Sequence, residues 1–253
     1  HAGGETWVSE PVSSRDHTER MLRAAGVEVM DGQAGVGVAG PVQRLSLPHL
    51  SIPGDFSSAA PHMAAAALVP GSRVRLENVN LNPTRAGLLQ VLGRMGVEVA
   101  IEEMREVAGE PCGDLVVEGG ELIGTEVVPE EVPSMIDELP LVALLGALAR
   151  GETEVRGAEE LRVKETDRIA KVVEALGGIG ATITEREDGF RVVGGPRLIG
   201  GEVHSAGDHR LAMLGAVAGL VADAGVSIGG FDAVAVSYPG FVSDLAAIGG
   251  VPA

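Results

Sequence analysis

Cysteine, aromatic side chains and positive charge are all scarce in this chain of 253 residues. The single cysteine, Cys112, excludes an internal disulfide and favours a reducing compartment, so the cytoplasm is the expected location. Aromatic residues make up 2% of the chain, too few for platforms that stack nucleic-acid bases or sugars. The formal net charge is −17, from 19 Lys and Arg against 36 Asp and Glu. This field repels phosphate backbones and anionic bilayers, so we expect neither a nucleic-acid partner nor a membrane partner.

Long hydrophobic runs and cofactor motifs are also missing. The longest uncharged apolar stretches, 139–149 and 211–222, have 11 and 12 residues, well below the roughly 20 that span a bilayer. The six histidines show no His-Glu-x-x-His spacing, so we expect no metal. The segment Gly35–Gly40 matches a dinucleotide-binding glycine pattern, but Pro41 and a strand-like segment follow it where that pattern needs a helix. We therefore expect no cofactor, and any ligand must be held mainly by charge and backbone groups.

An internal repeat organises the chain. A strand that starts with Gly, a polar loop, a helix that ends in Gly and a second strand recur with variations. The copies start at Gly4, Gly71, Gly151 and Gly225, so the unit has about 75 residues. This length is too great for a solenoid repeat and suits a βαβαββ layer, which predicts an α/β fold.

Each of the last three copies is preceded by an apolar helix that opens on an aspartate: Asp55, Asp137 or Asp208. These helices are hydrophobic on nearly every side, so we expect them at the centre of a three-fold pseudo-symmetric, inside-out barrel-like domain. Equivalent helix N-termini then point to one end, where partial positive charge and free N–H groups favour anions. The double-proline stretch 47–53 predicts a crossover. We therefore expect a complete three-repeat domain at residues 54–253 and the end of a second, similar domain at residues 1–53.

The densest group of charged residues contains Lys164, Glu165 and Arg168. Helical spacing predicts that Glu165 and Lys164 both lie near Arg168. A solvated, salt-bridged first turn of a helix explains the same pattern. The equivalent junctions of two other copies carry Arg15 and Arg85, so cations recur where helix N-termini already favour anions. Because arginine grips carboxylate and phosphate bidentately while a carboxyl group transfers a proton, the group also suits chemistry on an anionic substrate.

Asp208, His209 and Arg210 form the next group. Asp208 can simply cap a helix, as can Asp55 and Asp137. Three caps at equivalent positions are compatible with pure architecture, but an aspartate at a convergent cleft is also a candidate general base. The sequence leaves both interpretations open, and geometry has to decide between them.

Residues 161–169, Leu-Arg-Val-Lys-Glu-Thr-Asp-Arg-Ile, resemble the signature of the EPSP synthase family. Further segments resemble family motifs in the same order and spacing: 14–19, 54–59, 81–85, 207–210 and 237–239. The match covers essentially the whole chain. It implies a two-domain, inside-out α/β fold built of six βαβαββ units, with substrates bound in the cleft between the domains.

The resemblance also implies a reaction of the shikimate pathway, which leads to aromatic amino acids. The enolpyruvyl group of phosphoenolpyruvate is transferred to the 5-hydroxyl of shikimate 3-phosphate through a tetrahedral intermediate, and phosphate is released. By the same resemblance, Asp137 would hold and deprotonate the hydroxyl, and Glu165 would protonate the methylene carbon of phosphoenolpyruvate. Addition followed by elimination requires such an acid and such a base.

The substrate-binding residues that the resemblance implies are Arg15, Asp137, Lys164, Arg168 and Arg210. Arg168 and Arg210 would bind the carboxylate and phosphate of phosphoenolpyruvate. Lys164 and Arg15 would contact shikimate 3-phosphate, the latter from the other domain. Two anionic substrates require clustered cations of this kind.

The chain departs from the family pattern in two ways. Val236 stands where some members carry a lysine, so one cation on the phosphoenolpyruvate side is missing or replaced. The family's front segment, with further lysine, arginine and serine ligands, is absent from this chain, which opens with His1. We therefore expect a C-terminal part that is inactive by itself, with the missing N-terminal part as its partner. The alternatives are UDP-N-acetylglucosamine enolpyruvyl transferase and a non-catalytic module that binds anions.

Overall fold

The structure is a computed structural model that describes residues 2–249 apart from residues 11, 13 and 48. Its helices are α1 (His17–Ala24), α2 (Phe56–Leu68), α3 (Gly87–Arg94), α4 (Leu139–Leu148), α5 (Arg168–Gly178), α6 (His209–Gly219) and α7 (Phe241–Ala247). Its strands are β1 (Gly4–Val8), β2 (Val29–Gly32), β3 (Gly35–Gly40), β4 (Arg73–Asn80), β5 (Glu98–Val107), β6 (Glu110–Glu118), β7 (Glu126–Val127), β8 (Glu152–Val155), β9 (Thr182–Arg186), β10 (Gly189–Val193), β11 (Gly201–His204) and β12 (Val226–Gly229). Short 3-10 turns are η1 (Val132–Ser134), η2 (Ile136–Glu138), η3 (Glu159–Val163) and η4 (Phe231–Val236).

The strand order of the sheets reveals the repeated unit. β4-β6-β5, β8-β10-β9 and β1-β3-β2 have the same antiparallel order, and a helix follows the first strand of each set along the chain. In two units a parallel strand and a further helix come first, as β7-α4-β8 and β11-α6-β12. Gly54 forms the matching parallel bridge to β4 across α2. The predicted βαβαββ unit and the α/β fold class follow directly from this order.

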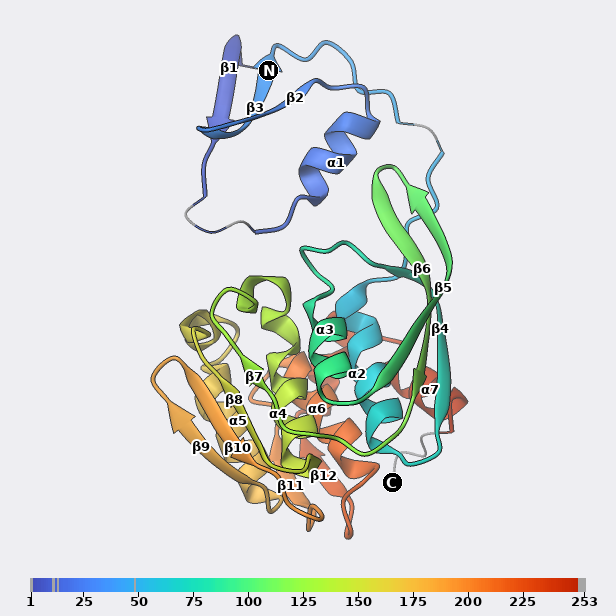
Figure 1. Cartoon of the computed structure of the whole chain (residues 1–253), viewed down its shortest axis with the longest axis vertical. Coiled ribbons are helices and arrows are strands. Elements are labelled where there is room, and N and C mark those ends of the chain that lie inside the picture. The colour runs from blue at the N-terminus through green and yellow to red at the C-terminus, as the bar shows by residue number, and fades with distance from the viewer. Residues whose placement is uncertain (1, 11, 13, 48, 250–253) are drawn as a thin grey trace.

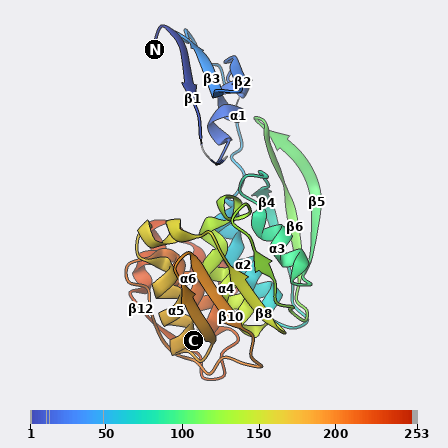
Figure 2. The same cartoon turned by 60° about the vertical axis from the view of Figure 1, so that its left-hand side comes forward.

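The two ends of the described chain hold incomplete units. The elements β1-α1-β2-β3 correspond to the second half of a unit, and the glycine-patterned segment Gly35–Gly40 is strand β3, not a phosphate loop. The last unit, β11-α6-β12-α7, has only two paired strands among the described residues, where the unit before it has four. The third repeat predicted for residues 54–253 is therefore not complete among the described residues. Figures 1 and 2 show β1–β3 and α1 lying apart from the other elements, with the β5–β6 hairpin extending toward α1.

Helices α2, α4 and α6 pack against one another at the centre of residues 54–249, as their composition predicts. A glycine lets α4 lie close to strand β8: a Cβ on Gly146 would lie 2.7 Å from Cβ of Thr153. None of the described helices is both long enough and apolar enough to cross a bilayer. Asp55 and Asp208 cap α2 and α6 by accepting backbone N–H groups at 2.8 Å. Asp137 does not cap a helix, because it lies inside η2 and α4 begins two residues later.

A buried histidine links α2 to the segment before α7. His62 is 3% exposed, and its Nε2 lies 3.1 Å from the Tyr238 hydroxyl, which donates to Asp244 at 2.7 Å. Since that hydroxyl's proton goes to the carboxylate, His62 Nε2 is the donor, and Nδ1 has no hydrogen-bond partner among the described residues. Burial lowers the pKa of His62 below its usual 6.5, against the opposing charge of Asp244.

We predict that this histidine makes stability pH-dependent. Between the lowered pKa of folded His62 and the ordinary 6.5, His62 binds a proton in the unfolded chain but not in the folded chain. The free energy of unfolding therefore rises with pH over this range. The contribution of His62 is complete above pH 6.5 and is lost as the pH falls through the lowered pKa. His62→Phe should reduce this slope, measured as urea midpoints on both sides of pH 6.5. Part of the slope should remain, because burial also lowers the pKa of His209. His204→Gln, at an exposed histidine, is the control and should keep it. An unchanged slope in His62→Phe would contradict the prediction.

Candidate active site

Arg168, the first residue of α5, lies buried at the centre of a cluster of charged side chains. Asp167 caps α5 by accepting the Ala170 N–H, which fixes the start of the helix. The Arg168 side chain is 1% exposed, and its Nε lies 2.7 Å from Oδ2 of Asp208, which is 0% exposed. Burial alone would lower the pKa of Arg168, but the hydrogen bond and charge of Asp208 raise it. The buried guanidinium therefore stays charged and ties the start of α5 to the start of α6.

Asp137 brings together three arginines from distant parts of the chain. Its Oδ1 lies 3.2 Å from Nη1 of Arg168. Its Oδ2 lies 2.8 Å from Nη2 of Arg15 and 3.3 Å from Nη2 of Arg210. Burial would raise the pKa of Asp137, but the charge of Arg210, with Arg15 and Arg168, lowers it to about 2. Asp137 is therefore an ionised carboxylate near neutral pH. Of the three aspartates, Asp55 and Asp208 cap helices, and capping is excluded only for Asp137.

Glu165 and Lys164 precede α5 in a segment that is not helical. Glu165 pairs with Nη2 of Arg168, so the candidate acid and the candidate base contact the same guanidinium. The Glu165 side chain is 49% exposed, which leaves it open to a ligand. Lys164 instead pairs with Glu160. The helical spacing that places Lys164 near Arg168 does not apply, because η3 ends before Lys164 and α5 starts after it.

The other interpretation of this charged segment, a solvated group of salt bridges, applies to Arg162. Arg162 Nη1 lies 2.8 Å from Asp167 and 2.9 Å from Glu185, with both carboxylates well exposed. Arg162 thus belongs to a solvated pair network, whereas Arg168 is enclosed.

Three further polar residues join the cluster. The sequence singled out Arg85 as a recurring cation, but it gave no role to Ser57 or Glu138. Glu138 is 1% exposed and accepts a hydrogen bond from Ser57, which accepts one from Arg85. Burial raises the pKa of Glu138, against the charge of Arg210 and the Ser57 hydrogen bond. The sequence did contain one signal for Glu138. It is a second carboxylate after Asp137, directly before the wholly apolar α4, where packing alone gives no reason for a charged residue.

These contacts join the starts of α2, α4 and α6. Ser57 in the first turn of α2 bonds Glu138 before α4, and Arg210 at the start of α6 has Nη1 3.9 Å from Oε1 of Glu138. The prediction that equivalent helix starts point to one end is confirmed by these contacts. Anion-favouring helix starts and clustered guanidinium groups therefore coincide.

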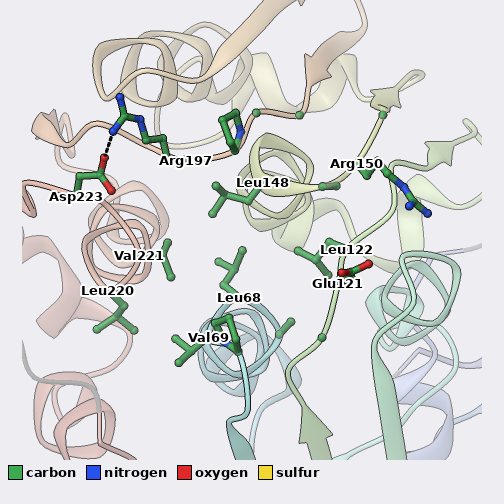
Figure 3. Close-up of a pocket in the computed structure, with 18 residues that line it drawn as sticks. Leu68, Val69, Glu121, Leu122, Leu148, Arg150, Arg197, Leu220, Val221 and Asp223 are labelled. Carbon is green, nitrogen blue, oxygen red and sulfur yellow. Dashed lines mark hydrogen bonds and ion pairs between the residues drawn. The ribbon is translucent and has the colours of Figure 1, made fainter.

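A hollow of about 880 Å³ lies at the opposite end of the same helices (Figure 3). Leu68, Leu148 and Val221, from the ends of α2, α4 and the segment after α6, lie around it. The charged residues of the cluster do not line this hollow. A smaller hollow, of about 360 Å³, reaches the cluster through Asp55 and Arg85. The cluster of arginines and carboxylates thus lies at the helix starts and not at the larger hollow.

The fold and the cluster define a class of protein: a repeated-unit α/β protein that gathers arginines and carboxylates at helix starts, suited to ligands with phosphate or carboxylate groups. The family model for EPSP synthase (3-phosphoshikimate 1-carboxyvinyltransferase) matches residues 1–245. The chain belongs to this family, which confirms the resemblance found in residues 161–169.

Individual relatives agree with the family match. The 3-phosphoshikimate 1-carboxyvinyltransferase of Desulfitobacterium hafniense is 47% identical over 241 residues, covering 95% of this chain and 55% of that protein. The corresponding protein of Gloeobacter violaceus is 48% identical over 247 residues, covering 98% of this chain and 57% of that protein. A solved EPSP synthase structure from Acinetobacter baumannii has a TM-score of 0.92 at 39% identity, covering 98% of this chain and 57% of that one. The chain spans about half the length of the curated relatives it matches.

We predict that the buried pair of Arg168 and Asp208 contributes strongly to the free energy of unfolding, because it joins the starts of α5 and α6. Asp208→Asn keeps a side-chain oxygen for the α6 cap but removes the charge that faces Arg168. The free energy of unfolding should fall by about 3 kcal/mol, because the buried guanidinium loses its fully buried partner at Nε and keeps only Asp137 and Glu165. Urea unfolding measures this. Asp223→Asn, which breaks the exposed pair with Arg197, should cost less than about 1 kcal/mol. Equal losses in the two variants would contradict the prediction.

Proposed function

We propose that this chain is the C-terminal part of an enzyme that transfers the enolpyruvyl group of phosphoenolpyruvate to the 5-hydroxyl of shikimate 3-phosphate. The single observation that carries the proposal is the contact of Asp137 and Glu165 with one guanidinium, that of Arg168, in a chain of the EPSP synthase family. A base and an acid flanking a buried cation suit an addition followed by an elimination on anionic substrates.

The arginines of the cluster are proposed to bind the substrates. Arg168 and Arg210 would hold phosphoenolpyruvate, and Arg15, whose segment precedes α1, would reach shikimate 3-phosphate. Arg210 supports this role, because its Nε is buried without a hydrogen-bond partner among the described residues. Lys164 would leave its exposed partner Glu160 to contact shikimate 3-phosphate.

The proposed base needs activation. A carboxylate with a pKa of about 2, as Asp137 has here, is a weak base for a hydroxyl. Substrate phosphate and carboxylate groups compete for the same guanidinium groups. When Arg15 and Arg210 turn from Asp137 to the substrates, the pKa of Asp137 rises, because part of the positive charge that lowers it is neutralised. Binding of both anions would thus prepare the base.

We further propose that the N-terminal part of the same protein is the partner of this chain, with the domain boundary at residue 53. Trp7, Val8 and Met21 are 37%, 62% and 49% exposed, so the apolar faces of β1 and α1 lack a cover. The last unit has two strands fewer than the unit before it among the described residues. Both features support a completing segment from elsewhere. Cys112, buried in β6, needs no oxidising compartment and suits the cytoplasm that we propose.

We predict phosphate release from phosphoenolpyruvate when this chain and the N-terminal part are combined, with shikimate 3-phosphate as acceptor and not with UDP-N-acetylglucosamine. Glu165→Gln should lower kcat about 100-fold or more, because the proton donor is lost, while binding of shikimate 3-phosphate persists. Glu152→Gln, at an exposed glutamate paired with Arg191, is the matched control and should leave kcat unchanged.

The other outcomes of this assay separate the alternatives. Release only with UDP-N-acetylglucosamine would assign the chain to the sister activity. Release with neither acceptor, from a folded complex, would contradict an enzymatic function and favour a module that only binds anions.

A further inference from the structure

A buried series of polar contacts lies behind Asp137 and connects the candidate active site to the start of α2. At one end, Nη1 of Arg210 lies 3.9 Å from Oε1 of Glu138. Glu138 accepts a hydrogen bond from Ser57, which lies 81 residues earlier in the chain. Ser57 accepts a hydrogen bond from Nη2 of Arg85, and Arg85 Nη2 lies 3.6 Å from Oδ1 of Asp55.

The Ser57 hydroxyl determines which group donates and which accepts in each of these hydrogen bonds. A guanidinium can only donate, so the Ser57 oxygen accepts from Arg85 and its single proton goes to Glu138. Glu138 is therefore an acceptor at the oxygen that also faces Arg210. The side chains of Ser57 and Glu138 are buried, so water does not compete for these contacts.

The charge of Glu138 is not needed for packing. A buried carboxylate is expensive, and the amide of a glutamine would accept the same Ser57 hydrogen bond without that cost. What the carboxylate adds is attraction for Arg210, whose other carboxylate contact is Asp137 at 3.3 Å. When a substrate anion draws Arg210 away from Asp137, Glu138 is the carboxylate that still holds the guanidinium in place.

We propose that Glu138 is a positioning residue that orients Arg210 for an anionic ligand, and that Ser57 and Arg85 hold Glu138 in place. The inference rests on the proposed function for the identity of that ligand, phosphoenolpyruvate. It assigns no bond-making role to Glu138, which acts only through Arg210.

The test measures steady-state kinetics of the combined protein and direct binding of phosphoenolpyruvate to this chain by calorimetry. Glu138→Gln should raise the KM for phosphoenolpyruvate, and its dissociation constant, about tenfold, through loss of the charge that attracts Arg210. The KM for shikimate 3-phosphate and kcat should change less than about twofold, a split that general destabilisation would not produce. Ser57→Ala should shift the same constants in the same direction by a smaller factor.

Glu131→Gln is the matched control, because Glu131 pairs with Arg94 away from the cluster. It should leave both KM values unchanged. If the unsubstituted protein shows no turnover, the proposed function fails, and the binding measurement still decides the role of Glu138. Equal phosphoenolpyruvate affinity in the unsubstituted chain and in Glu138→Gln, or no binding by either, would overturn the inference, as would equal increases in both KM values.

Discussion

The buried guanidinium of Arg168 is the constraint on which the polar end of this molecule depends. A charge that is 1% exposed must be surrounded by acceptors, and the chain supplies carboxylates from three places: Asp208 at the start of α6, Asp137 before α4, and Glu165 before α5. Satisfying one cation therefore fixes the relative positions of three helix starts. The same pairing places the candidate acid, Glu165, and the candidate base, Asp137, next to the Arg168 guanidinium. The fold and the proposed chemistry therefore both depend on surrounding this buried charge with carboxylates.

The three core helices divide the molecule into two ends with different properties. Their starts carry charged and polar groups that contact one another, and their ends carry leucine and valine around a hollow of about 880 Å³. Aligned helices of this kind concentrate partial positive charge at their starts, which offsets the acidic character of the chain where anions would bind. A net charge of −17 is thus compatible with a local site for phosphate and carboxylate groups.

Much of this arrangement is encoded locally and could be predicted. Apolar composition on every side identifies α4 and α6 as core helices, and the recurrence of strand and helix signals predicts the βαβαββ unit. Local spacing failed where the backbone is not helical, as at Lys164. It also could not show that Asp137 lies in a 3-10 turn, with its carboxylate paired to arginines and not to backbone N–H groups. The contact of Ser57 with Glu138 spans 81 residues and depends on how α2 packs on α4, so no local pattern announces it.

Asp137 is an anion held by three guanidinium groups from distant parts of the chain. The most direct measurement is the pH titration of the Asp137 side-chain carboxyl carbon by NMR in the ligand-free chain. This pairing predicts a midpoint at about 2, well below the usual 3.8. A midpoint at or above 3.8 would contradict it, because burial of Asp137 without effective pairing to Arg15, Arg168 and Arg210 would raise the pKa instead.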